Sequence, residues 1–188
     1  MQSLGNLTVL TGPSGVGKGT IVRKILDNHS DVWLSISATT RQPREGEIEG
    51  KHYFFLEKKN FREIIDKEGF LEWASFSNNF YGTPKKIVQE KIEQGTNVLL
   101  EIELEGSRQI RKSFPEALQI FLAPPNLSEL EKRIRGRGTE TEEAIRDRLA
   151  IANNELMAKK EFDAVVINED IEKAFLEIEE LMGLNTKN

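Results

Sequence analysis

Short apolar runs alternate along the chain with segments whose apolar residues recur every three or four positions, a pattern typical of an α/β protein. The run at 7–11 is rich in β-branched residues and predicts a buried strand, followed by a glycine-rich loop and a helix over 20–27. Further strands are predicted over 97–103, 117–123 and 164–167. Strands that alternate with helices predict a parallel sheet covered on both faces.

The middle of the chain departs from this alternation. Residues 51–95 predict strands over 53–56 and 70–76, a helix over 61–67, and a helix over 84–94 that begins at a proline and ends before a glycine. We interpret this segment as an α/β insertion within one domain, which the length of 188 residues fits. The other predicted elements are a strand over 32–37, helices over 107–113, 127–135 and 170–182, and a helix after Thr139 and Glu142, which have capping-box spacing.

Composition narrows the functional classes. The formal net charge of −5 disfavours nucleic acid as the main partner. The absence of cysteine excludes disulfides and thiol nucleophiles, and the only histidines, His29 and His52, are too few for a multi-histidine metal centre. We expect both histidines at the surface without a role, and a hard cation such as Mg²⁺ as any metal. Since neither a secretory leader pattern nor an apolar run of about 18 residues is visible, we expect a cytoplasmic protein with no membrane partner.

A glycine-rich segment after the first strand carries the clearest chemistry. Gly12-Pro-Ser-Gly-Val-Gly-Lys18 matches the G-x-x-x-x-G-K pattern of a phosphate-binding loop. Its glycines let backbone N–H groups converge on phosphate oxygens, and Lys18 would neutralise outer phosphates. The strand before it and the helix after it favour this interpretation over an ordinary glycine turn. The next residue is Gly19 instead of Ser or Thr, so Thr20 is one place late for the usual Mg²⁺-binding hydroxyl.

A second group of residues could bind another phosphate. Arg41 and Arg44 lie three positions apart, and Tyr53 follows nine residues later. Arginine offers bidentate, charge-assisted hydrogen bonds to phosphate, and a tyrosine hydroxyl adds a neutral donor. On composition alone, arginines in a loop rich in proline and glycine are usually solvated surface residues.

The stretch from Thr39 to Phe55 resembles the guanylate kinase signature T-[ST]-R-x-x-[KR]-x-x-[DE]-x-x-G-x-x-Y-x-[FY] at every fixed position. Four further segments resemble motifs of that family in the same order and cover nearly the whole chain: Phe70-Leu-Glu-Trp-Ala, Asn79-Phe-Tyr-Gly-Thr83, Arg135-Gly-Arg-Gly-Thr139 and Val166-Ile-Asn-Glu-Asp170. The resemblance implies a P-loop NTPase-type three-layer α/β fold with a parallel core sheet. It divides the chain into a core (about 1–35, 96–125 and 161–188), a GMP-binding insertion (about 36–95) and a mobile lid (about 126–160).

The resemblance also implies a reaction, Mg²⁺-dependent transfer of the γ-phosphate of ATP to GMP by a monomer or weak homodimer. The residues that it assigns to catalysis are Lys18, Arg41, Arg137 and Arg148, with Arg133 a weaker third lid arginine. Those assigned to ATP are Gly12, Pro13, Ser14, Gly15, Val16, Gly17, Lys18, Gly19, Thr20 and Asn168. Those assigned to GMP are Ser37, Arg41, Arg44, Tyr53, Glu72, Tyr81, Thr83 and Glu103, and those assigned to the metal are Thr20 and Glu101, the latter through water.

The chemistry of the base agrees with the role that the resemblance gives to Glu72. Guanine presents N1–H and the 2-amino group as adjacent donors, which suit a carboxylate that accepts two hydrogen bonds. Adenine presents an acceptor at N1 and would leave the carboxylate facing a lone pair, a mismatch that discriminates strongly in a buried site. Without the resemblance, an exposed strand carboxylate would be the usual interpretation of Glu72.

Two departures from the family pattern and two alternative functions remain at this point. Glu101 and Glu103 stand where many guanylate kinases have aspartates, so each charge is kept while its reach grows by one methylene; the other departure is Gly19. One alternative is a guanylate-kinase-like binding module, which typically has a degraded phosphate loop. Another is a nucleoside monophosphate kinase with a different base preference.

Overall fold

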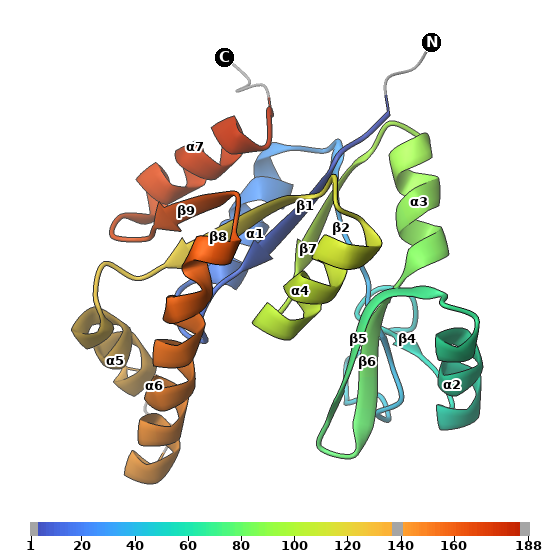
Figure 1. Ribbon diagram of the computed structural model, residues 1–188, viewed down its shortest axis with the longest axis horizontal. Helices are drawn as coiled ribbons and strands as arrows, with labels where there is room; N and C mark the ends of the chain where they lie inside the picture. The colour runs from blue at the N-terminus through green and yellow to red at the C-terminus, as the bar shows by residue number, and fades with distance from the viewer. Residues whose placement is uncertain (1–3, 137–140, 185–188) are drawn as a thin grey trace.

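Five parallel strands form the core sheet of the chain, in the spatial order β2-β7-β1-β8-β9. They appear in a computed structural model that describes residues 4–136 and 141–184 (Figure 1). Their bounds are β1 Leu7–Thr11, β2 Val32–Leu34, β7 Asn97–Glu101, β8 Leu118–Ala123 and β9 Ala164–Ile167. Because β1 is the central strand, the loop that follows it leaves from the middle of the carboxyl edge, where ligands bind in sheets of this type.

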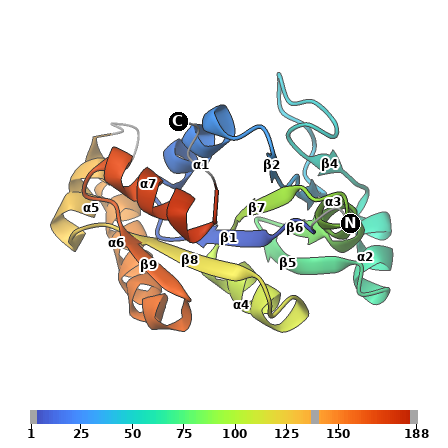
Figure 2. The same cartoon turned by 90° about the horizontal axis from the view of Figure 1, so that it is seen from above.

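Helices cover both faces of this sheet, as the view from above shows (Figure 2). The helices on one face are α1 Lys18–Asn28 and α7 Ile171–Leu181, and those on the other are α3 Lys85–Glu93 and α4 Leu104–Ser113. Side chains of successive strand residues point to opposite faces of the sheet and pack in different hydrophobic clusters. Leu10 lies in the cluster that contains Ile25 of α1, and Val9 lies in the cluster that contains Ile110 of α4. The predicted three-layer α/β fold with a parallel core sheet is therefore confirmed.

The insertion forms a second sheet, in the order β4-β3-β6-β5. Its elements are β3 Ala38–Thr39, β4 Phe54–Phe55, α2 Lys58–Asp66, β5 Phe70–Phe76 and β6 Asn79–Pro84. Phe61 of α2 is fully buried and stacks on Phe70 and Phe80, with ring centroids 4.3 and 5.5 Å away. The insertion thus has a small aromatic core of its own.

Strand β6 is the main element that sequence patterning missed. Gly82 and Pro84 lie inside it, and both residue types are unfavourable in strands. The strand exists because Ser77 and Asn78 adopt left-handed conformations, with φ of 47° and 63°, and close a two-residue hairpin between β5 and β6.

The remaining helices follow β8 in the chain and lie below the core sheet in the view of Figure 1. They are α5 Leu127–Arg135, α6 Glu142–Met157 and the 3₁₀ turn η1 Ala158–Glu161. The expected cap of α6 was wrong in its position, because Thr141 is the N-cap and its side chain accepts a hydrogen bond from the Ala144 N–H. Thr139 lies outside the described residues. Among the described helices, none is long and apolar enough to cross a membrane.

The expectation for the two histidines was half wrong. His52 is exposed, and its Nδ1 accepts the backbone N–H of Ile48. His29, however, is only 3% exposed and pairs through Nε2 with the carboxylate of Glu179, itself 4% exposed. A helix-end position suggested the surface, but α7 packs over the end of α1 and encloses both groups.

Candidate active site

The glycine-rich loop after β1 is shaped by backbone conformations that favour glycine. Gly15 and Gly17 have φ of 88° and 106°, in the left-handed region. A Cβ on Gly17 would also lie 2.6 Å from Nδ2 of Asn168, so a side chain is excluded on two grounds. Gly17 is the N-cap of α1, which directs the helix N-terminus and its free N–H groups to the loop.

Two side chains hold the loop from behind. Asn168 follows β9, is 4% exposed, and donates from Nδ2 to the carbonyl oxygen of Val16 at 2.7 Å. Arg133 of α5 donates to the same carbonyl at 3.4 Å and to the carbonyl of Asn168 at 2.9 Å. Side chains from the Val166–Asp170 segment and from the region of the expected lid therefore bond to the backbone of the loop.

In front of the loop lies an open cavity of about 370 Å³. Its lining combines backbone donors, two cations and two carboxylates: Pro13, Ser14, Gly15, Gly17, Lys18, Gly19, Thr20, Arg23, Glu101 and Glu103. The structure brings together here most of the residues expected at ATP and the metal. Arg23 also lines the cavity, although sequence reasoning did not single it out. Its position about one turn into α1, just beyond the loop, could have indicated this.

Lys18 is folded back over the loop. It is 8% exposed, its Nζ donates to the carbonyl oxygen of Gly12, and the same nitrogen lies 4.0 Å from Oε1 of Glu103. The ammonium group thus lies at the mouth of the cavity between the loop and the first turn of α4.

Two acidic groups around this cavity have raised pKa values. Burial raises the pKa of Glu101, and nearby Lys18 partly offsets that effect. Burial and the charge of Glu103 likewise raise the pKa of Glu155, which comes from α6. An acid from the α5–α6 region therefore belongs to the same electrostatic environment, and sequence reasoning did not find it.

Of the arginines near the expected lid, Arg137 and Arg148 were assigned to catalysis, whereas Arg146 was given no role. Arg148 donates from Nη2 to the hydroxyl of Ser14, so α6 reaches the phosphate loop directly. Arg146 is exposed and its Nε donates to the carbonyl of Glu142 within the helix, in line with a helix-face charge. Arg137 lies outside the described residues.

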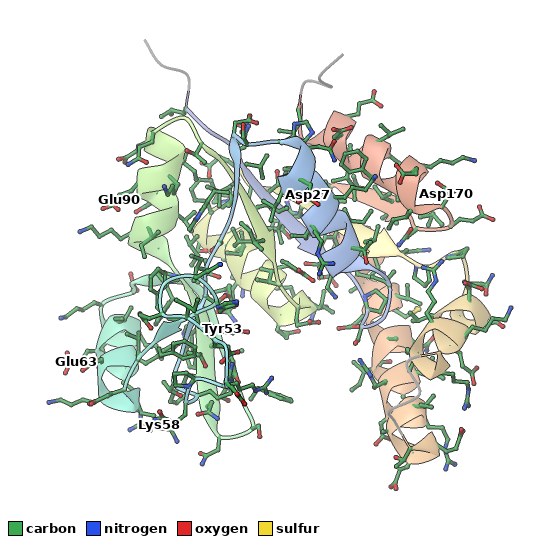
Figure 3. All side chains as sticks on the ribbon, turned by 180° about the vertical axis from the view of Figure 1, so that it is seen from behind. Asp27, Tyr53, Lys58, Glu63, Glu90 and Asp170 are labelled. Atoms are coloured by element: carbon green, nitrogen blue, oxygen red, sulfur yellow. The ribbon has the colours of Figure 1, made fainter. Side chains whose placement is uncertain are left out.

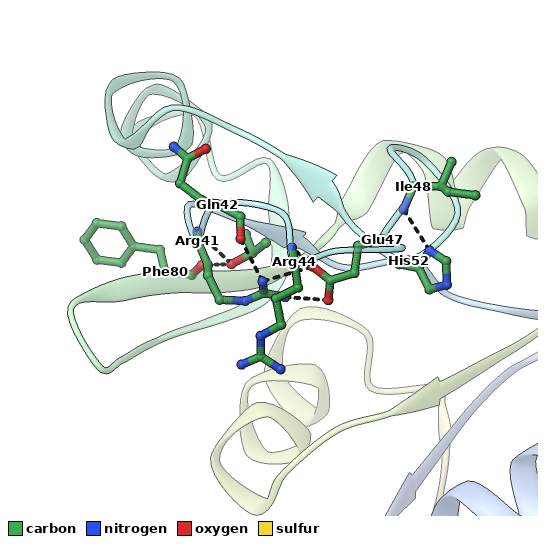
Figure 4. A network of polar contacts seen from close by, with 8 residues as sticks. Arg41, Gln42, Arg44, Glu47, Ile48, His52 and Phe80 are labelled. Atoms are coloured by element: carbon green, nitrogen blue, oxygen red, sulfur yellow. Dashed lines mark hydrogen bonds and ion pairs between the residues drawn. The ribbon is translucent and has the colours of Figure 1, made fainter.

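A second polar site is built in the insertion around Arg41 (Figure 4). Its Nη1 and Nη2 donate to the two carboxylate oxygens of Glu47 at 3.0 and 2.8 Å, and Nη1 also donates to the carbonyl of Gln42 at 2.7 Å. The backbone N–H of Arg44 adds a third hydrogen bond to Glu47, at 2.7 Å. These bonds, that of Arg41 first, lower the pKa of Glu47 to about 2. Neither Glu47 nor Gln42 engages the edge of the guanidinium formed by Nε and the second Nη2 hydrogen.

Both tyrosines of the chain lie beside Arg41. The guanidinium carbon is 5.4 Å from the centroid of the Tyr53 ring, and the rings of Tyr53 and Tyr81 are 6.2 Å apart in an edge arrangement. Hydrogen bonding by Glu47 is the main cause of a raised Arg41 pKa, and the Tyr81 hydroxyl contributes. In Figure 3, Tyr53 lies toward the core while Glu63 and Lys58 mark the outer helix α2. The residues expected at the GMP phosphate are therefore gathered, with Arg44 exposed at the rim.

Glu72 of β5 is a buried carboxylate. It is 8% exposed, and its Oε1 accepts a hydrogen bond of 2.6 Å from the hydroxyl of Thr83 on β6. Burial raises the pKa of Glu72, and the Thr83 bonds partly oppose that shift. Ser37 is half-buried just before β3. The two expected base-reading residues on β5 and β6 are thus directly paired.

The two sites meet at the first turn of α4. Glu103, the N-cap of this helix, lies beside Lys18. Gly106 lies three residues later, and a Cβ on it would be 3.0 Å from Oε2 of Glu72. One helical turn therefore separates the neighbour of the phosphate-loop lysine from the neighbour of the buried carboxylate.

Glu47 is another residue of the site, besides Arg23 and Glu155, that sequence reasoning passed over. The signal was present, since Glu47 stands at the acidic position of the signature, but no role had been attached to it. The signature threonines have a structural role as well. Thr39 and Thr40 fasten the start of the loop to β6, with the Thr39 hydroxyl donating to the Phe80 carbonyl at 3.0 Å and the Phe80 N–H donating to the Thr40 hydroxyl at 2.9 Å.

The fold and the phosphate loop define a P-loop NTPase-type α/β protein. The structure of shikimate kinase from Bacteroides thetaiotaomicron shares the fold, with a TM-score of 0.52, 14% identity and coverage of 95% of this chain and 99% of that one. A likeness at that identity shows the architecture alone.

More specific comparisons show the family. The family model for guanylate kinase matches residues 4–184. The guanylate kinase of Prochlorococcus marinus strain NATL2A is 88% identical over 184 residues, which cover 98% of this chain and 99% of that protein. The crystal structure of guanylate kinase from Anaplasma phagocytophilum has a TM-score of 0.74 and 30% identity, and the match covers 100% of this chain and 89% of that one. The chain belongs to the guanylate kinase family.

Proposed function

We propose that ATP binds at the phosphate loop, that GMP binds in the insertion, and that the first turn of α4 joins the two sites. The reaction is that of the family, transfer of the γ-phosphate of ATP to GMP to give ADP and GDP. The observation that carries the assignment of sites is the placement of Lys18 and Glu72 at either end of this turn. Phosphoryl transfer needs in-line positioning and charge neutralisation more than covalent help, and this arrangement supplies both.

On the ATP side, the loop from Gly12 to Thr20 cradles the phosphates through backbone N–H groups. Lys18 exchanges its bond to the Gly12 carbonyl for the outer phosphates. Ser14 and Arg148 already share a hydrogen bond, so the Arg148 guanidinium lies at the phosphate loop before the nucleotides bind. Asn168 supports this side by holding the Val16 carbonyl, which keeps the neighbouring N–H groups directed into the cavity.

The donors at the cavity fit Mg²⁺. Magnesium is usually held by one or two carboxylates, waters and substrate phosphates, and the cavity offers the Glu101 carboxylate and the Thr20 hydroxyl. A Cβ on Gly19 would lie 3.9 Å from Oε1 of Glu101, so the longer acid extends toward the position that lacks a hydroxyl. When bound, the ion would offset phosphate charge; Glu101 and Thr20 would hold it, Glu101 through water.

On the GMP side, the edge of the Arg41 guanidinium that Glu47 and Gln42 leave unengaged would face the phosphate together with Arg44 and the hydroxyls of Tyr53 and Tyr81. A side-on guanidinium edge presents two parallel donors, which match two phosphate oxygens. Glu47 holds the end of the guanidinium formed by Nη1 and Nη2 and therefore fixes the plane of the fork before substrate arrives. Preorganised donors of this kind lose less entropy on binding.

The guanine is recognised by Glu72, with Thr83 and Ser37 beside it and Glu103 approaching the 2-amino group. Because Thr83 donates to Oε1, the carboxylate is oriented before the base binds. Burial makes a mismatched base costly, since the acceptor would lose its donors away from water. Glu72 accepts both guanine donors only when it is ionised. Because burial raises the pKa of Glu72, this ionisation becomes a condition for recognising the base.

Binding of both substrates is expected to bring the insertion (36–95) and the lid (126–160) over the core. Closure would complete the site only when both nucleotides are present and would exclude water that otherwise hydrolyses ATP. We infer that the protein acts in the cytoplasm, as a monomer or weak homodimer. The intact loop and both paired sites support an enzyme over a binding module.

Base selectivity tests the assignment. Glu72→Gln keeps the size of the side chain but replaces one acceptor oxygen by a donor, so kcat/KM for GMP should fall by about 10²-fold, as for loss of charged hydrogen bonds. The KM for ATP should change less than about twofold. Glu68→Gln, an exposed carboxylate before β5, is the control. Full GMP activity in Glu72→Gln would place the base elsewhere.

A further inference from the structure

Strand β5, which carries Glu72, is the edge strand of the inserted sheet. Glu72 lies opposite Thr83 of β6, and the backbone groups of its two neighbours that bond to side chains of α4, the Leu71 carbonyl and the N–H and carbonyl of Trp73, point away from β6. An edge with unpaired groups of this kind is normally left to water or covered by another element.

One face of α4 covers this edge. The side-chain amide of Gln109 accepts the Trp73 N–H at 3.0 Å and donates to the Trp73 carbonyl at 2.9 Å, so it replaces a neighbouring strand at that residue. The hydroxyl of Ser113 donates to the Leu71 carbonyl at 2.7 Å. The backbone on both sides of Glu72 is thus fixed to a helix of the core.

The strand is also bent at this point. The register of β5 against β6 shifts between Phe70 and Glu72, so Leu71 is the extra residue of a bulge. Phe70 packs in the aromatic cluster of the insertion, whereas Leu71 packs in the core cluster with Ile110 of α4. Bulges redirect side chains and are common next to active sites. Here the bulge allows successive side chains to serve different layers and brings Glu72 against α4.

The helix makes room for the carboxylate with a glycine. A Cβ on Gly106 would lie 3.0 Å from Oε2 and 3.4 Å from Cδ of Glu72. Glycine inside a helix is unfavourable relative to alanine, so helix formation does not explain the residue. Gly106, Gln109 and Ser113 are spaced by three and four positions and therefore share one face of α4.

We propose that this face of α4, composed of Gly106, Gln109 and Ser113, positions Glu72 and thereby sets the selectivity of the enzyme for the 2-amino group of guanine. The inference rests on the proposed function of Glu72 and deepens it. The three residues act through Glu72 and are positioning residues. A carboxylate that accepts N1–H and the 2-amino group together must be placed to within a few tenths of an ångström, whereas one bond alone tolerates more displacement.

The first test is Gly106→Ala, measured with GMP and with inosine monophosphate, which keeps N1–H and lacks the 2-amino group. The added methyl group displaces the carboxylate, so the ratio of kcat/KM for GMP to that for inosine monophosphate should fall by about 10-fold, as for one weakened charged bond. The KM for ATP should stay within about twofold. Because alanine favours the helix, the Tm should not fall. A stable variant with an unchanged ratio would contradict the proposal.

The second test removes the amide that holds Trp73. Gln109→Ala should lower the same ratio by about threefold to 10-fold, again with little change in the KM for ATP. Gln89→Ala, on the exposed side of the neighbouring helix α3, is the matched control and should keep the wild-type ratio. A purely structural role for Gln109 would lower the Tm or the amount of active enzyme and leave the ratio unchanged, and that result overturns the proposal even if Gly106→Ala fails to fold.

Glu72→Gln separates this inference from the function on which it rests. If Glu72→Gln loses the GMP preference and neither α4 variant does, α4 does not position Glu72. If Glu72→Gln keeps the preference, the assignment of the base site is wrong, and the inference falls with it.

Discussion

The ATP side and the GMP side of the active site are constructed differently. The ATP side is one contiguous loop whose shape comes from glycines, with Asn168 and Arg133 both donating to the Val16 carbonyl from behind. The GMP side is assembled from paired side chains, Arg41 with Glu47 on one loop and Glu72 with Thr83 across two strands. A backbone cradle is sensitive to any added side chain, whereas paired side chains are sensitive to loss of charge. The two halves should therefore fail in different ways when mutated.

The largest effect is expected on the ATP side. Lys18→Met removes the cation from the loop, so kcat/KM should fall on the order of 10³-fold, similar to the loss of a main transition-state donor. A coupled ADP-release assay measures this. Lys24→Met is the control, because Lys24 lies on the same helix and pairs at 2.8 Å with Glu172 of α7. A loss of less than about threefold in Lys18→Met would contradict the role given to the loop.

A smaller effect should come from the ion pair on the GMP side. Arg41→Ala should lower kcat/KM for GMP about 10²-fold, and Glu47→Gln about 10-fold through a raised KM, because the fork loses its support. If Glu47 acts only through Arg41, the double variant should be no worse than Arg41→Ala. Additive losses would show that Glu47 has an independent role. Glu45→Gln, an exposed acid in the same loop, is the control.

The pH dependence should separate the two carboxylates of the GMP side. Glu47 has a pKa of about 2 and stays ionised throughout the assay range, whereas burial raises the pKa of Glu72 above its ordinary value of 4.5. Activity with GMP should therefore fall as the pH falls through the raised pKa of Glu72. Stability should change in the opposite sense, since ionising a buried acid destabilises the fold as the pH rises through that pKa. Glu72→Gln should remove the part of both dependences that follows the Glu72 pKa and leave that of Glu101 and Glu155, whose pKa values burial also raises; an unchanged profile would assign the dependence to those groups.

The smallest effect on activity is expected at the far end of α1. His29→Ala leaves Glu179 buried without its partner, so the free energy of unfolding should fall by about 3 kcal/mol, as when one member of a buried pair is removed. At a temperature where the variant remains folded, the KM values for ATP and GMP should be those of the wild type. A changed KM for ATP would mean that this anchor also shapes the phosphate loop.

The same contrast explains what the sequence could and could not predict. The loop at 12–20 and the parallel sheet around it were predicted from a contiguous motif and from the alternation of strands and helices. Strand β6 escaped prediction because its pairing depends on a hairpin turn at Ser77 and Asn78, and the buried state of His29 depends on α7, far away in the chain. Contacts between distant elements, such as Gln109 with Trp73, have no local signature at all.

The α4–β5 contact also bears on closure of the site. Because α4 fixes the backbone on both sides of Glu72, we expect the insertion to turn about this contact, so that Arg41 moves more than Glu72. Small-angle scattering should show compaction when an analogue joining both nucleotides is added. Unchanged scattering would mean that the open arrangement is already the working one.

The central claim is that this chain selects GMP through its inserted sheet and phosphorylates it from ATP bound at the loop. The most direct measurement is ADP release with Mg²⁺ and ATP when GMP, AMP, UMP and CMP are offered separately. The account predicts turnover with GMP that exceeds the other three by at least about 10²-fold. Comparable turnover with AMP would contradict the base site, and silence of the folded protein with all four would contradict the enzyme itself.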